Sequence, residues 1–133
     1  MNVQTYLFFD RCCEAAIQFY GEVFGAEVTF MMRFKDGPPV FIVPGAEDKI
    51  FHATMKFGET AVNMSDVVGE EQTAFGGFAL LAHLTDVEEA ERVFLALKIG
   101  GHVKVPLEQA FWAKRYGIVT DRFGVMWKIQ VNN

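Results

Sequence analysis

The sequence predicts an α+β fold in which two βαβββ modules form one domain of 133 residues. An internal repeat is the first observation behind this prediction, because residues 14–28 resemble residues 89–103 and Glu14 matches Glu89. The second is the alternation of apolar and polar residues along several short segments, which is typical of strands with one buried face. The third is a composition that is 51% hydrophobic and includes fourteen phenylalanines, enough for a packed core. A duplicated module accounts for all three.

The first module, residues 1–66, is expected to begin with a strand and a helix. Asp10 is placed to cap the helix N-terminus, and Gly25 is the expected stop because glycine readily adopts the left-handed conformation. Residues 26–35 alternate so regularly that one face of this strand should be buried. That face would carry Val28, Phe30, Met32 and Phe34. The expected elements are strands at 3–9, 26–35, 50–57 and 60–65 and a helix at 12–24, with a loop from 36 to 48.

The second module, residues 77–133, repeats this order after a linker at residues 67–76. Asp86 begins its helix, and residues 121–124 form the turn of its last hairpin. The expected elements are strands at 77–84, 101–107, 111–120 and 125–131 and a helix at 86–99. Each sheet would have one face under its helix and one open, concave face lined by the alternating polar residues, unless that face is plain solvent-exposed surface.

Composition and charge exclude several classes of partner. The net charge is −5 and lysine and arginine are scattered, so we expect no nucleic-acid partner. No apolar stretch approaches the ~20 residues that span a bilayer, and residues 1–4 lack a secretion-signal layout, so we expect a cytoplasmic protein without a membrane partner. Cys12 and Cys13 are neighbours at a helix start, where they are either reactive thiols or small packing residues. Neither GxGxxG nor GxxxxGK[ST] occurs, and we expect no cofactor.

The predicted open faces carry the candidate binding residues. His52 lies midway along a strand, where it is either a base or hydrogen-bonding group for a ligand or a structural histidine. Lys128 could hold an anionic group as a point charge, or it could form a local ion pair. Trp112 could form an aromatic wall or pack in an interface, and Arg115 could clamp an anion or lie on the surface. The candidate ligand-binding residues are His52, Thr54, Trp112, Arg115 and Lys128.

Several segments spread along the chain match the motifs of one known family. These segments are Tyr6-Leu7-Phe8-Phe9-Asp10, Val23-Phe24-Gly25-Ala26-Glu27, Lys49-Ile50-Phe51-His52-Ala53, Met64-Ser65-Asp66, Phe111-Trp112-Ala113 and Asp121-Arg122-Phe123-Gly124-Val125-Met126-Trp127. They resemble PhnB-like proteins, which belong to the glyoxalase, bleomycin-resistance and extradiol dioxygenase group, the vicinal oxygen chelate superfamily. The resemblance covers nearly the whole chain, and the tail is its most specific part. One departure is Arg122, where relatives often have proline.

The resemblance implies paired βαβββ modules with cup-shaped sheets, a homodimer, and in metal-using relatives His, Gln or Glu ligands on the first and last strands of each module. Carried onto this chain, those positions fall at or next to Val3, Met64, Ala79 and Lys128. A shift of one residue would offer Gln4 or Asn63, which do not complete a site. A catalytic divalent ion needs about three ligands from imidazole, carboxylate or thiolate, so we expect no metal at the standard position.

The sequence therefore favours a metal-independent homodimer that binds an unidentified small molecule, possibly anionic, in its concave faces. One alternative is a glyoxalase- or dioxygenase-type lyase or oxidoreductase with a relocated divalent metal site. A further alternative is a metal-free lyase or isomerase with His52 as its base.

Overall fold

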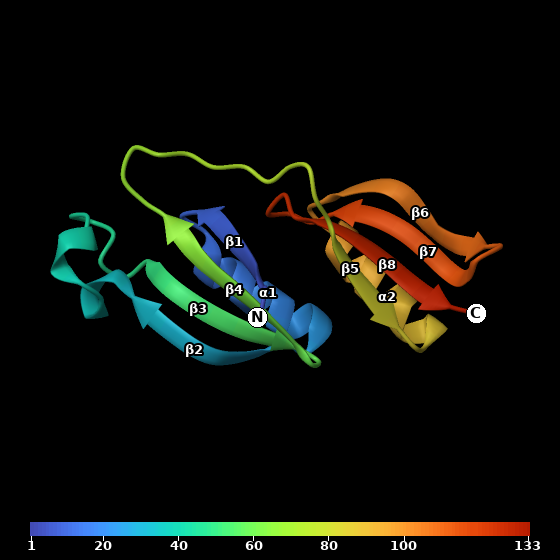
Figure 1. Cartoon of the computed structure of the whole chain (residues 1–133). Helices are drawn as coiled ribbons and strands as arrows, with labels where there is room; N and C mark the ends of the chain where they lie inside the picture. Colours follow the sequence, from blue (N-terminus) through green and yellow to red (C-terminus); the bar gives the residue numbers. More distant parts are fainter. The chain divides into compact units, whose positions relative to one another are not determined.

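The computed structural model describes residues 1 to 133, which divide into two compact units, Met1–Ala74 and Phe75–Asn133 (Figure 1). Each unit contains one four-stranded sheet with one helix packed against it. The division falls within the segment expected to be a linker, and no helix or strand lies between Val67 and Leu80. Neither helix is long and apolar enough to cross a membrane.

The first unit has the order βαβββ, and its first strand lies beside its last. Its sheet has the order β1-β4-β3-β2, in which β1 runs parallel to β4 and the other neighbours are antiparallel. A short 3-10 turn, Phe34–Asp36, ends the expected strand early, and a second one, Pro39–Phe41, lies in the expected loop. The elements are β1 (Thr5–Asp10), α1 (Cys13–Phe24), β2 (Glu27–Arg33), β3 (Ile50–Phe57) and β4 (Thr60–Val67).

The second unit repeats this topology, with the sheet order β5-β8-β7-β6 and β5 parallel to β8. The predicted pair of βαβββ modules is therefore confirmed. The strands of each sheet curve, as Figure 1 shows. The elements are β5 (Leu80–Leu84), α2 (Val87–Lys98), β6 (His102–Ala110), β7 (Ala113–Thr120) and β8 (Met126–Asn132).

Each helix covers one side of its own sheet, and that side forms the core of the unit. In the first unit Tyr20 of α1 is fully buried together with Phe9 of β1 and Met55 of β3. In the second unit α2 approaches β7 so closely that a Cβ on Gly117 would lie 2.8 Å from the ring of Phe94. Burial of each large side chain stabilises the fold by about 1.5–3 kcal/mol, so these contacts fix which side of each sheet remains open.

The strand β2 differs from its prediction. Val28 pairs with Met55 and Phe30 pairs with Thr54, so Thr29 forms a bulge between them. A bulge moves the following residues to the other face of a strand. Val28 therefore faces the helix side and Phe30 the open side, and both remain about half exposed, 45% and 46%, on an edge strand. The prediction of one buried apolar face for this strand is wrong.

The start of α1 also differs from its prediction, because Asp10 does not cap it. The helix begins after Cys12 without a side-chain cap. Instead the buried carboxylate of Asp66 on β4 accepts hydrogen bonds from the backbone N–H groups of Cys13 and Ile50, both at 2.8 Å. In the second unit Asp86 caps α2 as expected, accepting from the N–H of Glu89.

Candidate functional site

The open face of a sheet is defined here as the side away from its helix, and the first unit's open face is centred on His52. The Tyr6 hydroxyl lies 2.9 Å from His52 Nδ1, and Thr54 Oγ1 lies 3.4 Å from His52 Nε2. Thr54 Oγ1 donates to Asn63 Oδ1 at 2.7 Å, and Asn63 Nδ2 donates to Gln4 Oε1 at 2.8 Å. The strand pairings place Tyr6, Asn63 and Thr54 side by side on β1, β4 and β3. A continuous hydrogen-bonded chain therefore crosses this face.

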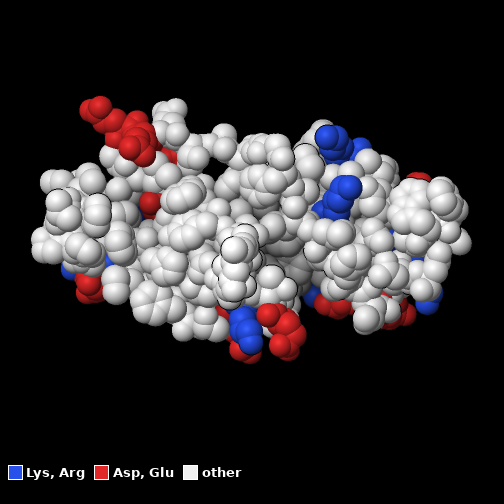
Figure 2. All heavy atoms as spheres, viewed as in Figure 1, with Lys and Arg blue, Asp and Glu red and all other residues white.

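Aromatic rings surround this hydrogen-bonded chain of side chains. The ring of Tyr6 lies 4.8 Å from that of Phe8 and 5.5 Å from that of His52, while the ring of Phe30 lies 5.7 Å from His52. Phe8 is 49% exposed, although rings of this size are usually buried. Figure 2 views this sheet from the side away from α1 and shows a largely uncharged surface. The first open face therefore offers aromatic contact area around a polar centre.

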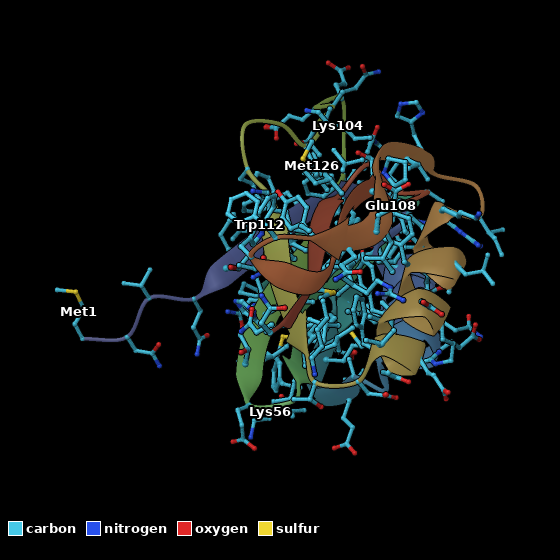
Figure 3. The ribbon with its side chains drawn as sticks, turned by 90° about the vertical axis from the view of Figure 1, so that its right-hand side faces the viewer. Met1, Lys56, Lys104, Glu108, Trp112 and Met126 are labelled. Carbon is cyan, nitrogen blue, oxygen red and sulfur yellow. The ribbon has the colours of Figure 1, made fainter.

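The second unit's open face is centred on Lys128 of β8. Its ammonium lies 5.6 Å from the centroid of the Tyr116 ring, and Trp112 packs edge-on against the same ring at 5.2 Å. Trp112 is 47% exposed. Figure 3 shows Trp112 and Met126 on the side of this sheet away from α2. A cation beside exposed aromatic rings can bind a flat molecule that carries a negative charge.

Arg115 does not lie on the open face of the second unit, unlike Trp112 and Lys128. It pairs with Val131 on β8 and faces the helix side, where its Nε donates to Glu91 on α2 at 3.2 Å. A register shift between Ala113 and Arg115 accompanies this placement. The helix side of the second unit also has a groove of about 430 Å³ between α2 and β6. Glu91, Phe94, Leu95, Lys98, Val103, Pro106 and Leu107 line this groove. Arg115 therefore has a structural partner, Glu91, and does not face the open side of the sheet.

Arg33 of the first unit is engaged in a similar way. Its guanidinium donates to both carboxylate oxygens of Glu14 on α1, at 3.1 and 2.6 Å, and to the backbone carbonyl of Asp48. The hydrogen bond from Arg33 holds the pKa of Glu14 below its ordinary value. This arginine therefore fastens β2 and the following loop to the helix.

The two cysteines match packing residues better than reactive thiols. Cys13 is fully buried, and burial, followed by the nearby Asp66 carboxylate, raises its pKa strongly. Burial and then Asp66 also raise the pKa of Cys12. Because the thiolate is the reactive form, both effects oppose thiol chemistry at neutral pH.

Comparison with known proteins settles the family. Residues 3–129 match the family described as Glyoxalase/Bleomycin resistance protein/Dioxygenase superfamily. The chain belongs to this superfamily. It is 30% identical to protein YjdN of Escherichia coli, over 98% of this chain and 95% of that protein.

Two solved structures resemble the chain along almost its whole length. Protein PA1353 from Pseudomonas aeruginosa is 33% identical with a TM-score of 0.89, covering 99% of this chain and 98% of that one. A PhnB protein from Bacillus cereus, described as a putative 3-demethylubiquinone-9 3-methyltransferase, is 26% identical with a TM-score of 0.83, covering 98% and 99%. The resemblance to PhnB-like proteins is therefore confirmed.

The superfamily's metal site does not fit the residues of this chain. Met64 is fully buried on the helix side, and the neighbouring Asn63, which does face the open side, is already bonded to Gln4 and Thr54. Lys128 brings positive charge to the corresponding place in the second unit. No three His, Cys, Asp or Glu side chains come together in an arrangement that could hold a metal ion. The donor chemistry that a divalent ion requires is thus not assembled at these positions.

Sequence reasoning did not select several residues of the two open faces. Tyr6 and Phe8 alternate with the buried Leu7 and Phe9, so their open position could have been predicted from the alternation. Asn63 was considered only as a metal ligand. Its hydrogen bond to Thr54 follows from the register between β3 and β4, and that register is not visible in the sequence.

Proposed function

We propose that this protein is a metal-independent, small-molecule-binding member of the superfamily that acts as a homodimer. Its ligands would bind on the open faces, with an anionic group at Lys128. The observation that carries this proposal is the position of Lys128, because a lysine at a place where metal-using relatives have a ligand repels cations and attracts carboxylates or phosphates. The adjacent rings of Tyr116 and Trp112 supply contact area for the rest of the molecule.

Exposed aromatic residues support the homodimer. Phe8, Phe30 and Trp112 are each about half exposed, and Phe111 is 93% exposed. Clusters of large apolar side chains on a surface mark binding sites or protein interfaces. A second copy of the chain would cover part of this area, and light scattering after gel filtration at micromolar concentration should give about twice the mass of 15.0 kDa. A monomer at these concentrations would contradict the dimer.

Thermal denaturation in the presence of small organic anions tests the binding function. Purified, dialysed protein is heated with a panel of aromatic carboxylates and phosphonates, each with and without EDTA. A ligand at a hundredfold its dissociation constant should add about 2.7 kcal/mol of stability, and EDTA should not change this gain. The proposal fails if no anion stabilises the protein. It also fails if stabilisation disappears with EDTA and returns with a divalent metal, which would favour a relocated metal site.

A further inference from the structure

The hydrogen-bonded chain on the first open face has a definite direction. Asn63 Nδ2 donates to Gln4 Oε1 at 2.8 Å and lies 3.5 Å from the backbone carbonyl of Thr5, which can only accept a hydrogen bond, and the two contacts together orient the amide. Asn63 Oδ1 therefore faces Thr54 as an acceptor. The single hydroxyl hydrogen of Thr54 is used in this bond at 2.7 Å.

The same reasoning assigns the donor and acceptor atoms of the imidazole and of Tyr6. Because the hydrogen of Thr54 is committed, its oxygen accepts from His52, so Nε2 carries the hydrogen in the neutral ring. His52 Nδ1 is then the acceptor, and the Tyr6 hydroxyl donates to it at 2.9 Å. The oxygen of Tyr6 thus has no hydrogen left to offer a ligand. It presents only lone pairs to the open face.

The rings around Tyr6 add a second attraction for positive charge. Tyr6 and Phe30 lie close to His52 and Phe8 packs against Tyr6, and aromatic ring faces attract ammonium groups. An acceptor oxygen among such rings is the arrangement that suits a protonated amine. It offers an anion nothing to bind.

The net charge of the first unit also favours a positively charged ligand. Residues 1–74 contain five lysines and arginines against eleven aspartates and glutamates, a net charge of −6, whereas residues 75–133 carry a net charge of +1. Four of the five cations have partners away from His52. Arg33 binds Glu14, Lys35 binds Asp48, Lys49 binds the carbonyl of Arg11, and Arg11 binds Asp10 and the carbonyl of Gly69. The remaining cation, Lys56, is opposite Glu27 at the other end of β3.

We infer that the first open face recognises an organic ammonium group, through the Tyr6 oxygen and the rings of Tyr6, Phe8 and Phe30. The inference rests on the proposed function, because it takes the open faces as the binding surfaces. It adds a ligand group of opposite charge to the one expected at Lys128.

Nuclear magnetic resonance titration of the full-length protein tests this assignment with four probes: benzylammonium, benzyltrimethylammonium, benzyl alcohol and benzoate. Benzylammonium should shift the signals of Tyr6, Phe30 and His52 and bind about threefold to tenfold more tightly than the uncharged benzyl alcohol. Tyr6→Phe should weaken benzylammonium about fivefold. It should leave benzyltrimethylammonium within about twofold, because a quaternary ion needs only the rings. Thr120→Val, which removes a hydroxyl from β7 of the second unit, is the control and should change neither.

The four probes separate the two proposals. Benzoate binding that is lost in Lys128→Met, with equal affinity for benzylammonium and benzyl alcohol, would overturn the ammonium site and leave the proposed function standing. Ammonium binding at Tyr6 without benzoate binding at Lys128 would support the ammonium site and contradict the anion site. Loss of benzyltrimethylammonium binding in the well-folded Tyr6→Phe protein would show that the tyrosine hydroxyl does not act as described.

Discussion

The open faces of the two units differ more than the scaffolds that carry them. Both sheets have the same strand order, with the first strand of each unit parallel to the last. On the first face, polar side chains bond to one another from Gln4 to Tyr6, whereas on the second the ammonium of Lys128 lies over an aromatic ring. Most core residues of the strands lie on the helix side, so the alternate positions can change with little loss of packing. Duplication thus kept one architecture and allowed two kinds of surface chemistry.

Removal of the buried aspartates should have the largest effect on stability. It tests a feature that both units have, a buried carboxylate that accepts hydrogen bonds from backbone N–H groups. Asp66→Ala leaves the N–H groups of Cys13 and Ile50 without their acceptor and should cost about 3 kcal/mol. Asp121→Ala should cost at least as much, since Asp121 accepts from the N–H groups of Phe123 and Val125 and from Trp127 Nε1.

Urea denaturation can assign each loss to its unit. Both tryptophans, Trp112 and Trp127, belong to the second unit, so their fluorescence reports on that unit while circular dichroism reports on both. Asp121→Ala should lower the midpoint detected by fluorescence. A free energy of unfolding for Asp66→Ala within about 1 kcal/mol of the parent would mean that the shared carboxylate support is unimportant.

Neutralisation of Lys128 should remove the charge that distinguishes the second face. Lys128→Met should weaken benzoate binding about tenfold to a hundredfold, as expected for one charge-assisted hydrogen bond. Calorimetric titration measures this loss. Lys104→Met makes the same chemical change at an exposed position on β6 and should leave the affinity unaltered; equal losses in both variants would indicate a long-range charge effect only.

Interruption of the hydrogen-bonded chain should have a smaller, local effect on the first face. Thr54→Val removes the group between His52 and Asn63 and should cost about 1 kcal/mol. Nitrogen-detected spectra of the imidazole should show the hydrogen on Nε2 in the parent protein and a weaker preference in the variant. Thr120→Val, on β7 of the second unit, serves as the control and should stay within about 0.5 kcal/mol of the parent.

The smallest effect is expected from the ion pair between Arg33 and Glu14, which is exposed. Arg33 lowers the pKa of Glu14, so the stability from this pair is present above the ordinary carboxyl pKa of 4.5 and is lost as the pH falls through the lowered value. Arg33→Gln should therefore reduce the free energy of unfolding at pH 7 by less than about 1 kcal/mol. Denaturation curves of the variant and the parent should differ in the free energy of unfolding at pH 7 but not at pH 2. A difference that grows in acid would contradict the assigned direction of the Glu14 pKa shift.

The fold could be predicted from the sequence because both modules follow simple patterns. Alternation placed Ala53 and Met55 under the helix and His52 and Thr54 on the opposite side, and the structure agrees. Prediction failed where a bulge intervenes, at Thr29 and again before Arg115, since an extra residue reverses the facing of all that follow. The cap of α1 was missed for a different reason, because Asp66 is distant in sequence and reaches the helix only after β4 has joined the sheet.

The candidate site could be predicted only in part. Single residues such as Lys128 are identified by their chemistry and by the alternation of their strand. The hydrogen-bonded chain of side chains from Gln4 to Tyr6 depends on how β1, β3 and β4 are aligned with one another. Three strands can be aligned in several ways that satisfy the same apolar pattern. A network across strands is therefore a product of the fold.

The parallel pairing of β1 with β4 also constrains how the protein is made. Thr5 at the start of the chain has its partner at Val62, so β1 has no sheet neighbour until β4 has left the ribosome. Contacts between such distant residues slow folding, because a long loop must close before they form. The first sheet should therefore close as a late, cooperative step of synthesis. A nascent chain arrested before Val62 should remain sensitive to protease, and one arrested well beyond Val67 should resist it.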